Sequence, residues 1–139
     1  MDRQTSELRG TAVAARRSEF PVWAAADKWM DWASLSFAAP FRALFWNLVR
    51  CTPETRDEAA MQRGQEQWAD LMEVADKALA ETLWLSGENL GIGDIPLGCI
   101  ACACFNLPIE RFSLPALEAW YDRLAQRRTY RKAVMTALT

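Results

Sequence analysis

Four cysteines are the side chains in this sequence with the clearest capacity for chemistry, because the chain contains no histidine. Without histidine there is no imidazole base, no imidazole metal ligand and no Ser-His or Cys-His nucleophile pair. Any catalysis would depend on carboxylates, thiols, hydroxyls, arginine or lysine. The cysteines are Cys51, Cys99, Cys102 and Cys104.

Cys99 and Cys102 form a Cys-x-x-Cys spacing, which also occurs in redox and metal sites. Here the spacing lies inside an apolar helical segment, and neither a second pair nor a histidine accompanies it. We therefore interpret Cys99 and Cys102 as small buried residues, and we expect all four thiols to be free. We predict no metal site and no catalytic residue in this chain.

The segment from Leu85 to Ile95 is typical of a turn that launches a buried helix. Gly91 stands at the N-cap, and Asp94 follows at N3, where its carboxylate can reach back to the backbone N–H of the cap. Leu90 and Ile95 have the spacing of a hydrophobic staple. The helix that follows is almost free of charge, so we expect it at the centre of the domain, covered on all sides.

The remaining apolar patterns also have the helical period of 3.6 residues, and no alternating strand pattern occurs. We predict an all-α fold, with five to seven helices bundled around the buried central helix. Residues 1–19 are expected to form a poorly ordered or partly helical arm, and residues 20–139 the domain. We expect Pro40 to kink or restart the first long helix, Ser113 to cap a later one, and the helix after Pro53 to end near Trp84.

Length and charge limit the functional classes. A chain of 139 residues fits one domain that can fold without disulfides or a metal. The net charge of −2 argues against a nucleic-acid partner. No signal segment and no apolar run long enough to span a membrane are found, so we predict a cytoplasmic protein with no membrane association.

Three strings in the chain resemble the helical C-terminal domain of bacterial glutathione S-transferases. They are the Leu-x-Gly turn with Asp94-Ile95, the string Asp27-Lys28-Trp29-Met30-Asp31-Trp32, and Leu44–Arg50 followed by Thr52-Pro53. That family usually has Ser or Thr at the cap and Ala before the Asp. Here Gly91 and Gly93 occupy these positions, so the side-chain half of the capping box is missing.

The resemblance implies a function that needs a second domain. In the family, a thioredoxin-like N-terminal half binds glutathione and supplies the residue that stabilises its thiolate. No such half is recognisable in this sequence, so we expect little activity from the chain alone and no cofactor of its own. Glutathione would be a co-substrate only with that domain supplied. A truncated gene product, an excised domain and a free-standing relative all remain open.

The resemblance and the helical facing together suggest a ligand site. Candidate residues for the wall of the electrophile pocket are Trp32, Arg42, Trp46 and Arg50. They would suit a hydrophobic or aromatic small molecule, in particular a flat, anionic or electrophilic aromatic ligand. Alternatively, both tryptophans pack internally and both arginines are solvated or paired.

The surface that the thioredoxin-like half normally covers should be exposed here. We expect a homo-oligomer or docking onto a thioredoxin-like domain. Two functional classes follow: the substrate-binding half of a glutathione S-transferase-like protein, or a free-standing, non-catalytic binding or interaction module that self-associates through this surface.

Overall fold

The computed structural model describes residues 23–136, and the regular elements of this part of the chain are all helices or helical turns joined by loops. The all-α prediction is confirmed. Over the described residues, extended pairing is limited to one isolated bridge between Trp84 and Gly87. The predicted arm at residues 1–19 and the start of the first long helix lie outside the described residues.

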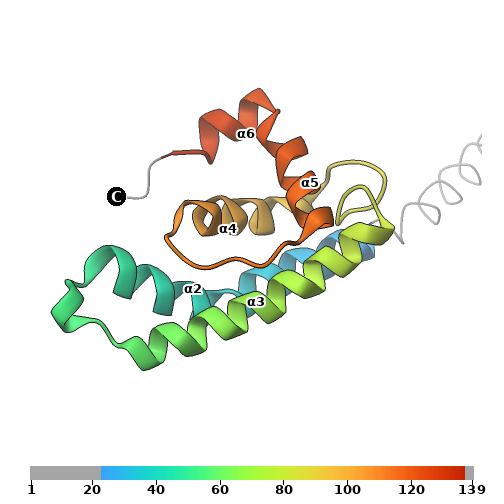
Figure 1. The fold of residues 1–139 in the computed structure, drawn as a ribbon. Helices are drawn as coiled ribbons and strands as arrows, with labels where there is room; N and C mark the ends of the chain where they lie inside the picture. The colour runs from blue at the N-terminus through green and yellow to red at the C-terminus, as the bar shows by residue number, and fades with distance from the viewer. Residues whose placement is uncertain (1–22, 137–139) are drawn as a thin grey trace, which may run out of the picture.

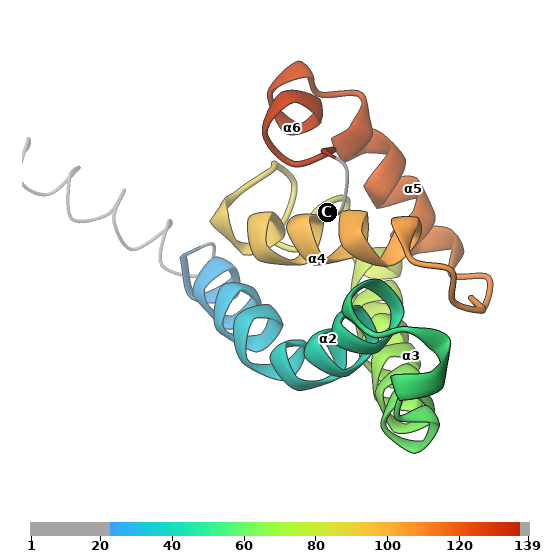
Figure 2. The same ribbon diagram turned by 90° about the vertical axis from the view of Figure 1, so that its left-hand side faces the viewer.

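A helix over residues 23–36 opens the described chain. The elements after it are α2 (Ala38–Phe45), a π-helical turn (Trp46–Arg50), a 3₁₀ turn (Pro53–Thr55), α3 (Glu58–Glu81), a 3₁₀ turn (Ile92–Asp94), α4 (Ile95–Asn106), α5 (Pro115–Ala125) and α6 (Arg128–Ala133). In Figures 1 and 2, α4 lies between α2 and α3 on one side and α5 and α6 on the other. The predicted central helix is therefore α4.

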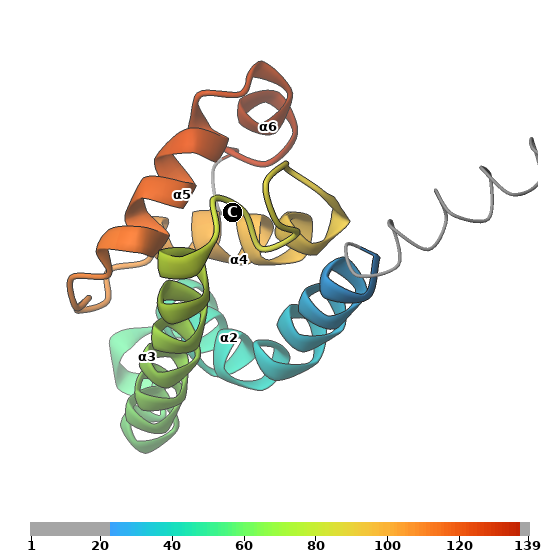
Figure 3. The same ribbon diagram turned by 90° about the vertical axis from the view of Figure 1, so that its right-hand side faces the viewer.

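The break between the first helix and α2 falls at Phe37, three residues before Pro40. Proline has no N–H to continue the helical ladder, so the preceding turn opens, as the sequence predicted. The Phe37 N–H to Ala33 O hydrogen bond is stretched to 3.3 Å, whereas Phe41 N–H donates to Phe37 O at 2.9 Å. Figure 3 shows the resulting bend between the first helix and α2, beside α3.

Glycine allows α2 and α3 to approach closely. A Cβ on Gly64 would lie 3.2 Å from Ala43 Cβ and 3.4 Å from Pro40 O, so a larger side chain would separate the helices. The core continues from this contact through the edge-to-face rings of Trp32, Phe37 and Trp68. Edge-to-face pairs add about 1 kcal/mol beyond their buried area.

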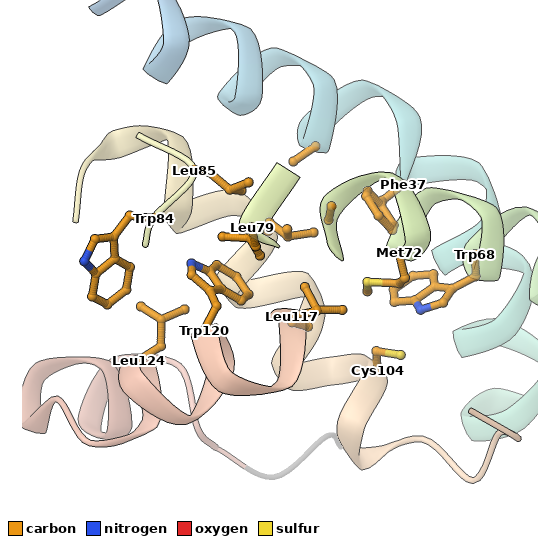
Figure 4. Close-up of a cluster of buried hydrophobic side chains, with 14 of the residues drawn as sticks. Phe37, Trp68, Met72, Leu79, Trp84, Leu85, Cys104, Leu117, Trp120 and Leu124 are labelled. Carbon is orange, nitrogen blue, oxygen red and sulfur yellow. The ribbon is translucent and has the colours of Figure 1, made fainter. Parts of the chain in front are cut away.

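The core reaches from this aromatic group to α5, as Figure 4 shows. Its buried side chains come from every layer of the bundle: Phe37, Leu44, Trp68, Met72, Leu79, Trp84, Leu85, Leu97, Cys104, Leu117, Trp120 and Leu124 are among them. One continuous cluster is what a single domain of this size requires.

Two predicted boundaries were wrong. α3 ends at Glu81, before the predicted Trp84, because Thr82 is extended and its hydroxyl bonds to Trp84 O at 2.9 Å. Leu114, not Ser113, is the N-cap of α5. The start of α5 is instead held by acidic side chains, since Asp76 of α3 accepts from Leu117 N–H at 2.9 Å.

Within the described residues, no helix is both long and apolar enough to cross a membrane.

Candidate functional site

Asp94 lies at the centre of the protein and is fully buried. Its Oδ1 accepts hydrogen bonds from Leu85 N–H at 2.8 Å and from the Trp120 indole N–H at 2.9 Å. Its Oδ2 accepts from Ser86 N–H at 3.2 Å and from Gly91 N–H at 3.1 Å. These four donors satisfy the hydrogen-bonding capacity that a buried carboxylate needs. Because they belong to the turn and to α5, and Asp94 itself stands at the start of α4, the carboxylate connects all three elements.

Gly91 is the N-cap of the turn that leads into α4, and Asp94 bonds back to its N–H. Gly91 has no side chain that could accept a hydrogen bond from the first turn. Ser86 supplies this acceptor instead, because its Oγ accepts from Gly93 N–H at 3.1 Å. A Cβ on Gly91 would lie 2.6 Å from Ser86 Cβ and Oγ. The glycine is thus required by the space that Ser86 occupies.

The staple residues have different surroundings. Leu90 packs against the core, whereas the Ile95 side chain is 56% exposed. Ile92 is also exposed, at 42%. The expectation that α4 is covered on all sides was therefore wrong at its first turns.

Cys99 continues this exposed side of α4, whereas Cys102 and Cys104 are buried. The interpretation of Cys99 and Cys102 as buried is confirmed for Cys102 and wrong for Cys99. Partial desolvation by the surrounding protein raises the pKa of the Cys99 thiol, with a further rise from Cys102. Burial raises the pKa of Cys104 to about 11, although the nearby Trp68 side chain acts in the opposite direction. The Cys99 and Cys104 thiols are therefore protonated at neutral pH and are poor nucleophiles there.

Of the four predicted wall residues, Arg42 and Trp46 line a common groove, whereas Trp32 and Arg50 are not among its lining residues. Trp32 is half-buried and stacks edge-to-face on Trp29 and Phe37, with ring centroids 5.1 and 5.3 Å apart. This agrees with the alternative in which Trp32 packs internally. The Arg50 guanidinium lies 5.8 Å from the centre of the Phe45 ring.

Arg42 and Trp46 do share a groove on the outer side of α2, one helical turn apart. The groove is shallow and is also lined by Ala39, Ala43 and Asn47. The Trp46 side chain is 60% exposed. Asn47 fixes the end of this surface, because its Nδ2 donates to Ala43 O at 2.8 Å and its Oδ1 accepts from Asp57 N–H at 2.8 Å.

A larger cleft of about 610 Å³ lies on another part of the molecule and was not predicted. It is enclosed by α3, the end of α4, the connecting segment before α5, and α5 itself. Its lining comprises Gln65, Trp68, Ala69, Met72, Glu73, Cys104, Phe105, residues 109–114, Leu117, Glu118, Tyr121 and Asp122. Because these positions come from four separate segments, no local sequence pattern marks them.

The part of the chain that the structure describes holds no group of three or more Cys, Asp or Glu side chains placed to bind a metal ion.

The comparisons with known proteins define the class of this protein. Residues 25–128 match the family "Glutathione S-transferase, C-terminal domain", and the chain belongs to that family. It is 36% identical over 121 residues to glutathione S-transferase GstB of Escherichia coli K12, covering 87% of this chain and 55% of that protein. The chain thus spans about half the length of this curated relative.

Solved structures show the same relationship. The theta class glutathione S-transferase of Xanthomonas axonopodis pv. citri, with glutathione bound, matches at 47% identity and a TM-score of 0.83. That match covers 86% of this chain and 63% of the other. Glutathione S-transferase-I bound with lactoylglutathione matches at a TM-score of 0.75 and 20% identity, covering 86% of this chain and 59% of that one, which shows a common fold.

Proposed function

We propose that this chain is the electrophile-binding helical half of a glutathione S-transferase-like protein, and that conjugation requires a separate glutathione-binding half. The observation that carries the proposal is the pattern of coverage. The chain is 47% identical to the Xanthomonas enzyme over 86% of its own length, yet covers 63% of that enzyme.

The chemistry of the transfer explains why a second half is needed. The reaction requires a thiolate to attack an electrophilic carbon, and a thiol with a pKa of roughly 8.5 is only a few per cent ionised at pH 7. Among the described cysteines, Cys99 and Cys104 have raised pKa values, so they do not substitute for an activated thiol. The activating group and the site for glutathione would come from the thioredoxin-like domain.

The start of α4 offers a surface on which that domain would dock. Ile92, in the turn before α4, and Ile95, at its first position, are exposed, whereas the opposite face of α4 lies in the core. Full burial of an isoleucine side chain stabilises an association by about 2 kcal/mol. The length of the relatives that lies outside the match supports a domain of this kind as the occupant of the surface.

The groove beside Arg42 and Trp46 would hold part of the electrophile. An exposed indole gives a flat apolar face, and a guanidinium one turn away suits a nitro or carboxylate group. The proposal for the pocket wall is therefore restricted to these two residues.

The test combines the chain with the glutathione-binding part of the Xanthomonas enzyme and measures conjugation of 1-chloro-2,4-dinitrobenzene. We expect no turnover by the chain alone and turnover by the mixture or a fusion. Trp46→Ala should raise KM for the electrophile several-fold and leave KM for glutathione unchanged. Phe112→Ala, which removes another exposed aromatic ring, is the matched control and should change neither value.

Turnover by the isolated chain would overturn the requirement for a second half. Ile95→Lys should prevent restoration of activity in the mixture while leaving the thermal unfolding midpoint of the chain unchanged. The other possible occupant of this surface is a second copy of the chain, and sedimentation of the chain alone tests it. A stable dimer that Ile95→Lys dissociates would identify the second copy as the occupant and would exclude the docking proposal.

A further inference from the structure

Tyr130 connects α6 to the two helices beside it. In Figures 1 and 3, α6 lies above α4 at the end of α5, and none of its residues is buried. The Tyr130 hydroxyl donates a hydrogen bond of 2.6 Å to Gly98 O of α4. Its ring packs edge-to-face on Tyr121 of α5, with ring centroids 6.3 Å apart. One partly buried side chain thus holds α6 against both neighbours.

Gly98 provides the space that the Tyr130 ring occupies. A Cβ at position 98 would lie 3.3 Å from Tyr130 Cε2 and 3.2 Å from Leu124 Cδ1. Glycine is less favourable than alanine inside a helix, and the close approach of Tyr130 accounts for its presence in α4. The surface of α4 is therefore shaped to receive this side chain.

α6 has little stability of its own. It is six residues long, whereas isolated helices shorter than about 12–15 residues are marginal in water. Arg128 and Lys132 are both exposed and stand four positions apart, and Arg127 and Arg131 repeat the spacing. Like charges at this spacing destabilise a helix. The position of α6 therefore depends on the contacts that Tyr130 makes.

The segment that follows α6 covers Cys102 of α4. The Cys102 thiol donates to Val134 O at 3.7 Å, and its side chain is 3% exposed. Cys104 is buried to a similar degree, at 4%, but lies beside Trp68 of α3 (Figure 4). Movement of α6 away from α4 would therefore uncover Cys102 and leave Cys104 covered.

We propose that α6 and residues 134–136 form a flap that opens from α4 as a unit while the rest of the bundle stays folded, with Tyr130 as the latch. The hinge is the turn between α5 and α6, where Arg131 donates to Ala125 O and Gln126 O, each at 3.2 Å. The flap controls access to the face of α4 between Gly98 and Cys102. It is independent of the proposed transferase function, because it needs no second domain and uses neither the Trp46 groove nor the Ile95 surface.

The test measures alkylation of the folded, full chain by iodoacetamide, with tandem mass spectrometry to separate Cys102 from Cys104. This reagent reacts slowly, so the rate at a covered thiol follows the equilibrium population of the open form. Tyr130→Phe keeps the ring and removes the hydroxyl. It should raise the rate at Cys102 about fivefold, as loss of one hydrogen bond predicts, and leave the rate at Cys104 unchanged.

Two further variants act on the flap without removing the Tyr130 hydroxyl. Gly98→Ala should also raise the rate at Cys102, because the new methyl group displaces the Tyr130 ring. Arg128→Glu replaces a repulsive pair with a Glu–Lys pair in the favourable order, and should lower the rate at Cys102 about threefold. Arg63→Glu, the same change at an exposed position of α3, is the matched control and should alter neither thiol.

Hydrogen exchange of the parent chain tests the flap even if Tyr130→Phe fails to fold. The amides of Arg131 and Val134, which donate to Arg127 O and Tyr130 O, should have protection factors at least about tenfold lower than those of α4. Equal protection of α6 and α4 would overturn the inference. The same conclusion would follow if Tyr130→Phe accelerated Cys102 and Cys104 equally, or accelerated neither.

Discussion

The indole N–H of Trp120 in α5 donates a hydrogen bond of 2.9 Å to the carboxylate of Asp94, which stands at the start of the central helix α4. The two residues are 26 positions apart in the sequence, and both are fully buried. The turn before α4 bonds to the same carboxylate. One side chain thus fixes the position of α4 relative to both its own turn and the following helix.

Asp94→Ala should be among the most destabilising substitutions in the chain. It would leave the Trp120 indole and three backbone N–H groups without their acceptor, at about 1–3 kcal/mol for each group that water cannot reach. We expect a loss of about 4 kcal/mol or more in the free energy of unfolding, measured by urea denaturation. Asp70→Ala, on the exposed side of α3, should change it by about 0.5 kcal/mol or less.

Gly91→Ser, which restores the usual capping residue, should destabilise this protein. The new Cβ would lie 2.6 Å from Ser86 Cβ, a distance that requires the loop to move. We expect a cost of about 1–3 kcal/mol, as for overpacking in other cores.

The double variant Ser86→Gly with Gly91→Ser tests the cause of that cost. Removal of the Ser86 side chain frees the space, and the new hydroxyl at position 91 can serve the N–H groups of the first turn. The double variant should be more stable than the sum of the single changes predicts, by at least about 1 kcal/mol. Strict additivity in urea denaturation would contradict this explanation of Gly91.

Stability should fall at alkaline pH partly because of Cys104. Its pKa is about 11 in the folded protein, against an ordinary value of 9.0, and burial is the main cause. Below pH 9 the thiol is protonated in both states and its contribution is fully present. As pH rises from 9 towards 11, the unfolded state ionises first, so up to about 1.4 kcal/mol per pH unit is lost.

Cys104→Ala should be less stable than the parent at pH 7, because it leaves a small cavity, but should lose less stability between pH 9 and 11. Urea denaturation at intervals of half a pH unit measures the difference. Parallel curves for the two proteins would show that Cys104 does not titrate as described.

Alkylation should distinguish the cysteines of α4. Cys99 is exposed, and Cys102 and Cys104 are buried, so iodoacetamide should modify Cys99 first. Its raised pKa lowers the thiolate fraction, so its rate at pH 7.5 should be below that of free cysteine. Peptide mass spectrometry follows each site, and the protein in denaturant, where all thiols are accessible, is the control. Equal rates at Cys99 and Cys104 in the native state would contradict the assigned burial.

The sequence predicted the centre of this fold because its signal is local. Gly91, Asp94 and the uncharged helix after them lie within 16 residues, and short-range spacing identifies a helix start. The resemblance to the glutathione S-transferase domain added the order of the remaining helices. The break before Pro40 was also predictable, because proline acts through the backbone.

The exposure of individual side chains and the position of the cleft were less predictable, because both depend on segments that are far apart in the sequence. An uncharged helix looks buried on every side in sequence, but Ile95 and Cys99 lie where no other described element covers them. Trp32 and Trp46 have the same residue type, yet one packs against Phe37 and the other faces outward. The cleft beside Trp68 arises only when α3 and α5 come together.

The uncharged character of α4 also affects how the chain is made. Ile95–Asn106 follows α3 in the sequence, and the side chains of α5 that cover it come later still. During synthesis, the face of α4 that α5 covers therefore stays exposed to solvent until residues up to Leu124 have left the ribosome. Segments exposed at this stage are prone to aggregation, so the interval before α5 emerges should be the period when the newborn protein most needs a chaperone.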